Sequence, residues 1–134
     1  MSQPTQIKFT ELVKIYYLRH LSALSLSAPS FQNDGFIATA TMVGSGGSVQ
    51  IRCGPAEYNA EIFIQNHKDQ KRWSLADLMS IECVRNWMHQ NRPNPSGKPR
   101  LEAEIECAFN LLLDGLGGVE NFQWLYSKGV TLAL

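Results

Sequence analysis

"FIATATMVGSGGSVQIRC", residues 36–53, carries the clearest indication of fold class in this 134-residue chain. Small and β-branched residues alternate along "FIATATMV", and Val49, Ile51 and Cys53 alternate with polar residues along "SVQIRC". A period of two places alternate side chains on opposite faces of a strand. The glycines of "GSGGS", residues 44–48, accept positive φ angles without a Cβ penalty and suit a hairpin loop. The stretch therefore predicts two antiparallel strands joined by a hairpin.

A third strand is predicted directly downstream, in "EYNAEIFIQ", residues 57–65. The side chains expected on one of its faces are Tyr58, Ala60, Ile62 and Ile64. Glu61 falls on the opposite face because neighbouring side chains of a strand point in opposite directions. The polar segment "NHKDQK", residues 66–71, is expected to turn the chain. Upstream, "SLSAPSFQNDG", residues 25–35, has the Ser, Pro, Asn, Asp and Gly composition of a turn.

Helices are predicted on both sides of these strands. The segment Phe9–Leu24 repeats apolar residues at steps of three and four, with Thr10 as a nearby cap. The residues on this apolar face are Phe9, Leu12, Val13, Tyr16, His20 and Ala23. In "WSLADL", Ser74 has the position of an N-cap and Asp77 lies three residues later. We expect this helix to continue to about His89, before the proline-rich connector "NRPNPSGKP".

A further helix is predicted from Pro99, which suits a first helical turn, to a stop at Gly115. One face of it is apolar and consists of Leu101, Ile105, Ala108 and Leu112. The segment "VENFQWLYSK", residues 119–128, predicts a short last helix, and "GVTLAL", residues 129–134, either a further strand or a loosely held tail. This order of a helix, three strands and two or three helices is typical of an α+β fold. We expect residues 1–134 to form a single domain with an antiparallel three- to four-stranded sheet packed against helices.

The overall composition argues against several classes of partner. Twelve Lys and Arg residues balance twelve Asp and Glu residues, so no global field attracts nucleic acid or an anionic membrane. No apolar run is long enough to cross a bilayer, and the first residues do not resemble a signal peptide. Cys53, Cys83 and Cys107 form no CxxC pair and are expected to be reduced. We therefore expect a cytoplasmic protein with no direct nucleic acid or membrane partner.

The residues also carry no recognisable catalytic, cofactor or metal motif. In "ECVRNWMH", Cys83 and His89 are six positions apart on a helix and point to different sides, so they cannot act as a nucleophile and base. Glu82 shares its side of the helix with Arg85 and His89, as is typical of a solvated face. The three histidines show no metal-ligand spacing, and "GSGGS" lacks the pattern of a phosphate-binding loop. No catalytic, cofactor-binding or metal-binding residue is predicted.

An acidic stripe on the last long helix is the best candidate for recognition of a partner. Glu102, Glu106, Asn110 and Asp114 follow one another at steps of four. Such a stripe speeds encounter with a basic protein and helps to select the partner. The alternative is an outer helix face that is merely solvated, which is the usual place of a charge run. Trp73, Trp87 and Trp124 are interpreted as core or half-buried residues rather than as an interface.

The chain resembles the immunity proteins of bacterial polymorphic-toxin systems, including those of contact-dependent growth inhibition. The resemblance covers the size and organisation of the whole chain, with stretches such as "IRCGPAEYNAEIFIQ" and "WSLADLMSIECVRNWM". Immunity proteins bind a cognate toxin domain, often a nuclease, and block its active site. The resemblance implies a noncatalytic inhibitor. As its mechanism we expect the acidic stripe, with a contribution from Glu82 and Glu61, to substitute for a polyanionic substrate and occupy a basic cleft on the toxin.

Two other functions remain open from the sequence. One is a small enzyme in which His20 or His89 meets a carboxylate only in the folded chain. The other is a structural subunit that oligomerises through "GVTLAL" as a pairing edge.

Overall fold

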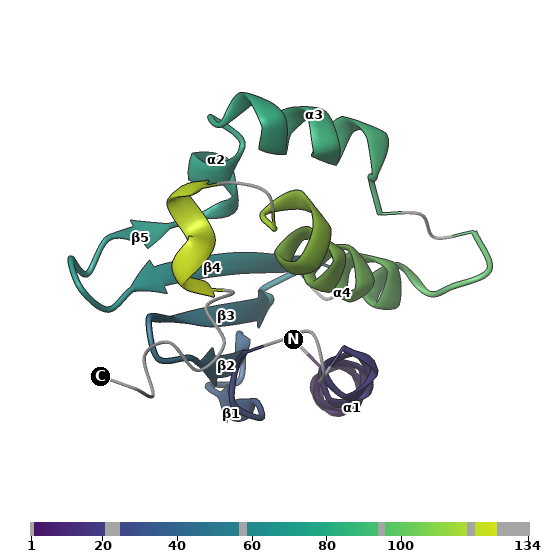
Figure 1. Cartoon of the computed structure of the whole chain (residues 1–134). Helices are drawn as coiled ribbons and strands as arrows, with labels where there is room; N and C mark the ends of the chain where they lie inside the picture. Colours follow the sequence, from purple (N-terminus) through teal and green to yellow (C-terminus); the bar gives the residue numbers. More distant parts are fainter. Residues whose placement is uncertain (1, 21–24, 57–58, 94–95, 118–119, 126–134) are drawn as a thin grey trace.

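The computed structural model of the chain describes residues 2–20, 25–56, 59–93, 96–117 and 120–125. Figure 1 shows the predicted order of a helix, strands and then helices. The strands are β1 (Ser30–Asn33), β2 (Ala38–Val43), β3 (Gly47–Cys53), β4 (Ala60–Asn66) and β5 (Arg72–Trp73). The helices are α1 (Gln3–Arg19), α2 (Leu75–Leu78), α3 (Glu82–Gln90), α4 (Arg100–Asn110), the π-helical turn η1 (Leu111–Gly115) and the 3-10 helix η2 (Glu120–Leu125). The α+β class is confirmed.

The sheet is an antiparallel meander in the order β1-β2-β3-β4-β5. The prediction of three to four strands was therefore too low. It missed β1, which lies inside the segment 25–35 that was expected to be a turn, and β5, which has only two residues. Both are short edge strands, and β1 shows no alternation of buried and exposed residues. Such strands are specified by pairing with a neighbour, here β2 and β4, and not by a local pattern.

The hairpin between β2 and β3 forms as predicted, but its glycines are needed for another reason. Val43 lies opposite Ser48, and the N–H of Gly44 donates to the carbonyl of Gly47 at 2.7 Å. Among the described residues, the glycines with positive φ are Gly35, Gly54 and Gly97. Gly46 and Gly47 instead lie under Trp124, where an added Cβ would meet the tryptophan at 3.0 Å and 1.9 Å, respectively. Gly46 and Gly47 are therefore required because Trp124 occupies the space of a side chain. Their backbone angles do not require glycine.

One face of the sheet is buried by α1, α4 and η2, which lie on the same side of it in Figure 1. The buried strand residues alternate as predicted and are Ala38, Ala40, Met42, Val49, Ile51, Cys53, Ala60, Ile62 and Ile64. They join side chains of α1 and α4 in one hydrophobic cluster of the described residues. At roughly 25 cal/mol per Å² of apolar surface, this burial is the main force that holds the helices on the sheet.

Helix α1 begins six residues earlier than predicted. The side chain of Ser2 accepts a hydrogen bond from the Thr5 N–H, so Ser2 is the N-cap. Thr10 is not a cap, since its hydroxyl donates to the carbonyl of Gln6 one turn back. The predicted apolar positions of the described part are buried, apart from half-buried His20. Residues 21–24 of the predicted helix lie outside the described residues.

The helix predicted from Ser74 to about His89 is two helices. Ser74 and Asp77 form the predicted capping box at the start of α2. Ile81, however, has extended backbone angles and is the N-cap of a second helix, α3. Ser80 lies at the break, where its hydroxyl donates to the carbonyl of Asp77 at 2.6 Å. A serine side chain that bonds the backbone in this way competes with helical hydrogen bonds. The break turns α3 away from the sheet (Figure 1).

Replacing Ser74 by alanine should remove this capping box. The Ser74 Oγ accepts from the Asp77 N–H at 3.2 Å, and an Asp77 oxygen accepts from the Ser74 N–H at 2.9 Å. Loss of an N-cap side chain costs about 1 kcal/mol, and urea denaturation of the variant measures it. Ser74→Asp, which keeps an acceptor, is the control; equal loss in both variants would contradict the assignment.

The chain after the proline-rich connector follows the prediction within the described residues. Leu101, Ile105, Ala108 and Leu112 are buried, and the helical path ends at Gly115. Phe122 and Leu125 of η2 are also buried. "GVTLAL" lies outside the described residues, so its prediction is untested. Searching the described residues for a helix long and apolar enough to cross a membrane found none.

Candidate functional site

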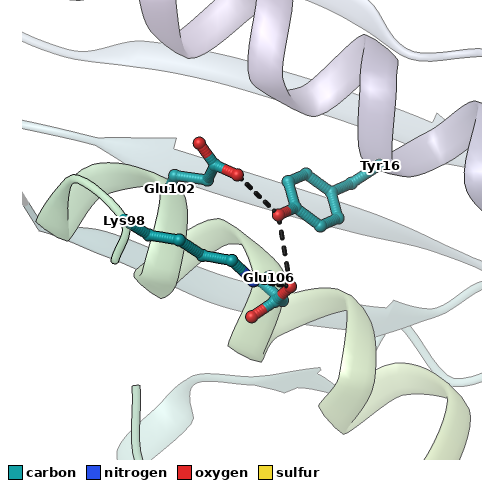
Figure 2. A network of polar contacts seen from close by, with 4 residues as sticks. All are labelled: Tyr16, Lys98, Glu102 and Glu106. Carbon is teal, nitrogen blue, oxygen red and sulfur yellow. Dashed lines mark hydrogen bonds and ion pairs between the residues drawn. The ribbon is translucent and has the colours of Figure 1, made fainter. Parts of the chain in front are cut away.

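Two members of the predicted acidic stripe, Glu102 and Glu106, lie against α1 (Figure 2). The buried Tyr16 hydroxyl lies 2.9 Å from an oxygen of Glu102 and 3.2 Å from an oxygen of Glu106, and it can donate its single proton to either. Lys98 forms an ion pair with the same Glu106 oxygen at 2.5 Å. The two carboxylates therefore fasten α4 to α1.

The groups of this network shift the pKa values of Tyr16 and Glu106 in opposite directions. Burial, followed by the hydrogen bond to Glu102 and the nearby negative charges, raises the pKa of Tyr16 to about 12. The hydrogen bond from Lys98 is the largest cause that lowers the pKa of Glu106. The Arg19 guanidinium carbon lies 4.6 Å from the centroid of the Tyr16 ring. Tyr16 therefore keeps its proton through the neutral pH range, and its hydroxyl remains a hydrogen-bond donor to the carboxyl groups of α4.

The six residues predicted to contact a partner do not share one setting. Glu102 and Glu106 are partly buried against α1, whereas Asn110 at the end of α4 and Asp114 in η1 are exposed. Two further predicted residues are also exposed, but on other elements: Glu82 on α3 and Glu61 on β4. The stripe is therefore divided between a packed half and an exposed half.

A small cavity lies between α4, α3 and β4, and sequence analysis did not single out its carboxylate. Glu104 lines it, and burial raises the pKa of that carboxyl, with Arg100 acting in the opposite direction. Cys107 lines it too; burial raises its pKa to about 11, and its thiol donates to the Asn91 carbonyl at 3.4 Å. The volume of about 30 Å³ is close to that of one water molecule. Cys107 and Cys53 are both buried, free thiols.

The histidines of the enzyme alternative lie apart from the described hollows. His20 stacks on Phe109 with ring centroids 6.1 Å apart, and His89 is exposed on α3 beside Arg92. Neither lines the cavity at Glu104 or the three surface hollows at the sheet and α1. Within the described ranges, no three His, Cys, Asp or Glu side chains are grouped to hold a metal ion.

The face of the sheet away from the helices carries a group of side chains that the sequence analysis missed. The guanidinium carbons of Arg52 on β3 and Arg72 on β5 lie 4.7 Å and 4.5 Å from the centroid of the Phe63 ring on β4. The Gln50 side-chain oxygen accepts a long hydrogen bond of 3.4 Å from each arginine. We call Gln50, Arg52, Phe63 and Arg72 the arginine cluster. Only the strand register brings these residues together, and no local spacing signals it.

A surface hollow of about 410 Å³ adjoins the arginine cluster. Arg52, Phe63 and Glu61 line its sheet side, and the segment after β3 closes another side with Gly54, Pro55, Ala56 and Asn59. In the strand register Arg52 lies opposite Glu61.

Comparison of the chain with protein-family models, curated proteins and solved structures gave no match.

Proposed function

We propose that this chain is a noncatalytic inhibitor that binds a protein toxin domain and occludes its active site, as the immunity proteins it resembles do. The observation that supports this proposal best is the face of the sheet that none of the described helices covers. None of its described side chains is buried: Ser30, Gln32, Thr39, Thr41, Val43, Ser48, Gln50, Arg52, Glu61, Phe63, Gln65 and Arg72. An antiparallel sheet with one open face is a rigid platform, and rigidity lowers the entropy cost of binding.

The dimensions of this face suit part of a protein interface. Strands of seven residues are roughly 23 Å long, and five strands span roughly 20 Å. The face therefore offers at most roughly 460 Å², somewhat more than half of the roughly 800 Å² that each partner buries in a stable complex. The hollow after β3 adds a concave rim to the platform.

In this proposal the acidic residues have two roles. Glu102 and Glu106 hold α4 on α1 through Tyr16. We assign them this structural role because contact with a partner would break their hydrogen bonds to Tyr16. Asn110 and Asp114 are the exposed part of the predicted stripe and, together with Glu82 and Glu61, remain predicted contact residues. We expect the inhibitor to act in the cytoplasm, where its partner would otherwise reach its substrate.

The test is protection against the protein encoded by the neighbouring gene. Its C-terminal domain, expressed alone, should arrest bacterial growth, and co-expression of this chain should restore growth. The purified pair should form a stable complex, measured by calorimetry with a catalytically inactive form of the domain. An unrelated nuclease toxin is the specificity control. A toxic neighbour that is neither bound nor neutralised would overturn the proposal, as would turnover of a substrate by this chain alone.

A further inference from the structure

We propose that the arginine cluster binds carboxylate side chains of an acidic segment on a partner protein. This inference rests on the proposed function in one respect, namely that the partner is a protein. It adds that the arginine cluster is the contact surface and that carboxylates of the partner are recognised there. The two guanidinium groups belong to β3 and β5, the neighbours of β4 on either side. Both reach the same Gln50 oxygen, so two positive charges converge at one point of the open sheet face.

The chain does not neutralise these charges with its own described carboxylates. Neither arginine forms an ion pair within the described ranges, although Glu61 lies opposite Arg52 in the strand register. The shared partner, Gln50, is a neutral amide at the long distance of 3.4 Å from each arginine. A site with two cations and one weak, neutral acceptor is complementary to an anion.

The stacking on Phe63 prepares the arginines for this role. A guanidinium group that lies over an aromatic ring keeps its N–H edge available for a bidentate contact with a carboxylate. The ring also restricts the side-chain rotamers, so less entropy is lost when a ligand binds. The adjoining hollow, about 410 Å³ in volume, has room for the carboxylate-bearing side chains.

An acidic protein segment fits this surface better than nucleic acid does. Single-stranded nucleic acid binds sheet faces by stacking its bases on aromatic rings along a positively charged groove. Phe63 is the aromatic residue of this face within the described strands, and the guanidinium groups of Arg52 and Arg72 already lie over its ring. The formal net charge of the chain is zero, and Glu61 interrupts the positive surface beside Arg52. A short acidic segment needs only two cations.

The experiment titrates the full chain with three probes: hexaglutamate, hexalysine and the oligonucleotide dT6. NMR signals of the arginine Nε–H groups report contact at Arg52 and Arg72. We expect hexaglutamate to shift these signals and hexalysine to leave them unchanged. The double variant Arg52→Ala/Arg72→Ala should bind hexaglutamate at least about tenfold more weakly, since two charge-assisted contacts are lost. The matched variant Lys8→Ala/Arg92→Ala removes two exposed cations elsewhere and should stay within about twofold of the wild type.

Glu61 gives a second test with the same readout. If the arginine cluster receives carboxylates, Glu61→Lys should strengthen hexaglutamate binding, because it replaces the negative charge opposite Arg52 by a positive one; weaker binding would count against the inference. Thermal unfolding of every variant checks that the fold is kept. Absence of hexaglutamate binding, binding that the double variant retains, or tighter binding of dT6 would each overturn the inference. Failure of the neighbouring toxin to bind, with the peptide site intact, would overturn only the proposed function.

Discussion

Replacing Gly47 by alanine is expected to lower the free energy of unfolding by about 2 kcal/mol or more, because overpacking of a filled site costs typically 1–3 kcal/mol. A Cβ at this position would lie 1.9 Å from the Cζ3 atom of Trp124 and 2.4 Å from the carbonyl oxygen of Gln65. The second atom belongs to the backbone of β4, which is hydrogen-bonded to β3. Relief would therefore require movement of both the tryptophan and the strand.

Urea denaturation followed by tryptophan fluorescence measures this effect. Ser48→Ala is the matched control: it is the next residue of β3, but its side chain lies on the open face, and it should change stability by no more than about 0.5 kcal/mol. In a Trp124→Ala background, Gly47→Ala should cost less than it does in the wild type but should still be destabilising, since the contact with the Gln65 carbonyl remains. Wild-type stability of Gly47→Ala would mean that Trp124 does not cover the hairpin.

The second large effect is expected in alkaline solution and arises from Tyr16. Its pKa is raised to about 12 in the folded chain, mainly by burial, against about 10 in the unfolded chain. The folded state therefore keeps its proton where the unfolded state has lost it, and this raises the cost of folding above pH 10. The stability is fully present below about pH 10, falls as the pH rises, and levels off above about 12. Two pKa units correspond to about 2 to 3 kcal/mol.

Comparing wild type with Tyr16→Phe isolates this contribution. Both proteins are denatured with urea at several pH values between about 9 and 12, the interval set by the two pKa values. The wild type should lose more stability over this interval than the variant, which has no phenol at this position. Phenolate absorbance of the folded proteins should show one tyrosine fewer titrating near pH 12 in the variant. Parallel stability curves would contradict the position of Tyr16 between Glu102 and Glu106.

The periodic parts of the fold were predicted correctly because their signals are local. The alternation along β2 and β3 and the capping box at Ser74 each depend on residues within a few positions of one another. The edge strands β1 and β5 and the break at Ser80 were missed, since their stability depends on pairing and on competing hydrogen bonds. The acidic stripe was predicted as one surface, but α1 takes up half of it.

The sequence by itself therefore determined the α+β class, the buried face of each main strand and the start of α2, because periodicity and capping act over less than two helical turns. Only the tertiary structure decided that Trp124 covers Gly47, that Tyr16 lies between two carboxylates, and that two arginines meet over Phe63. Each of these contacts joins residues from different elements. Their geometry follows from the register across several strands and from helix packing, which bring together residues that are far apart in the chain.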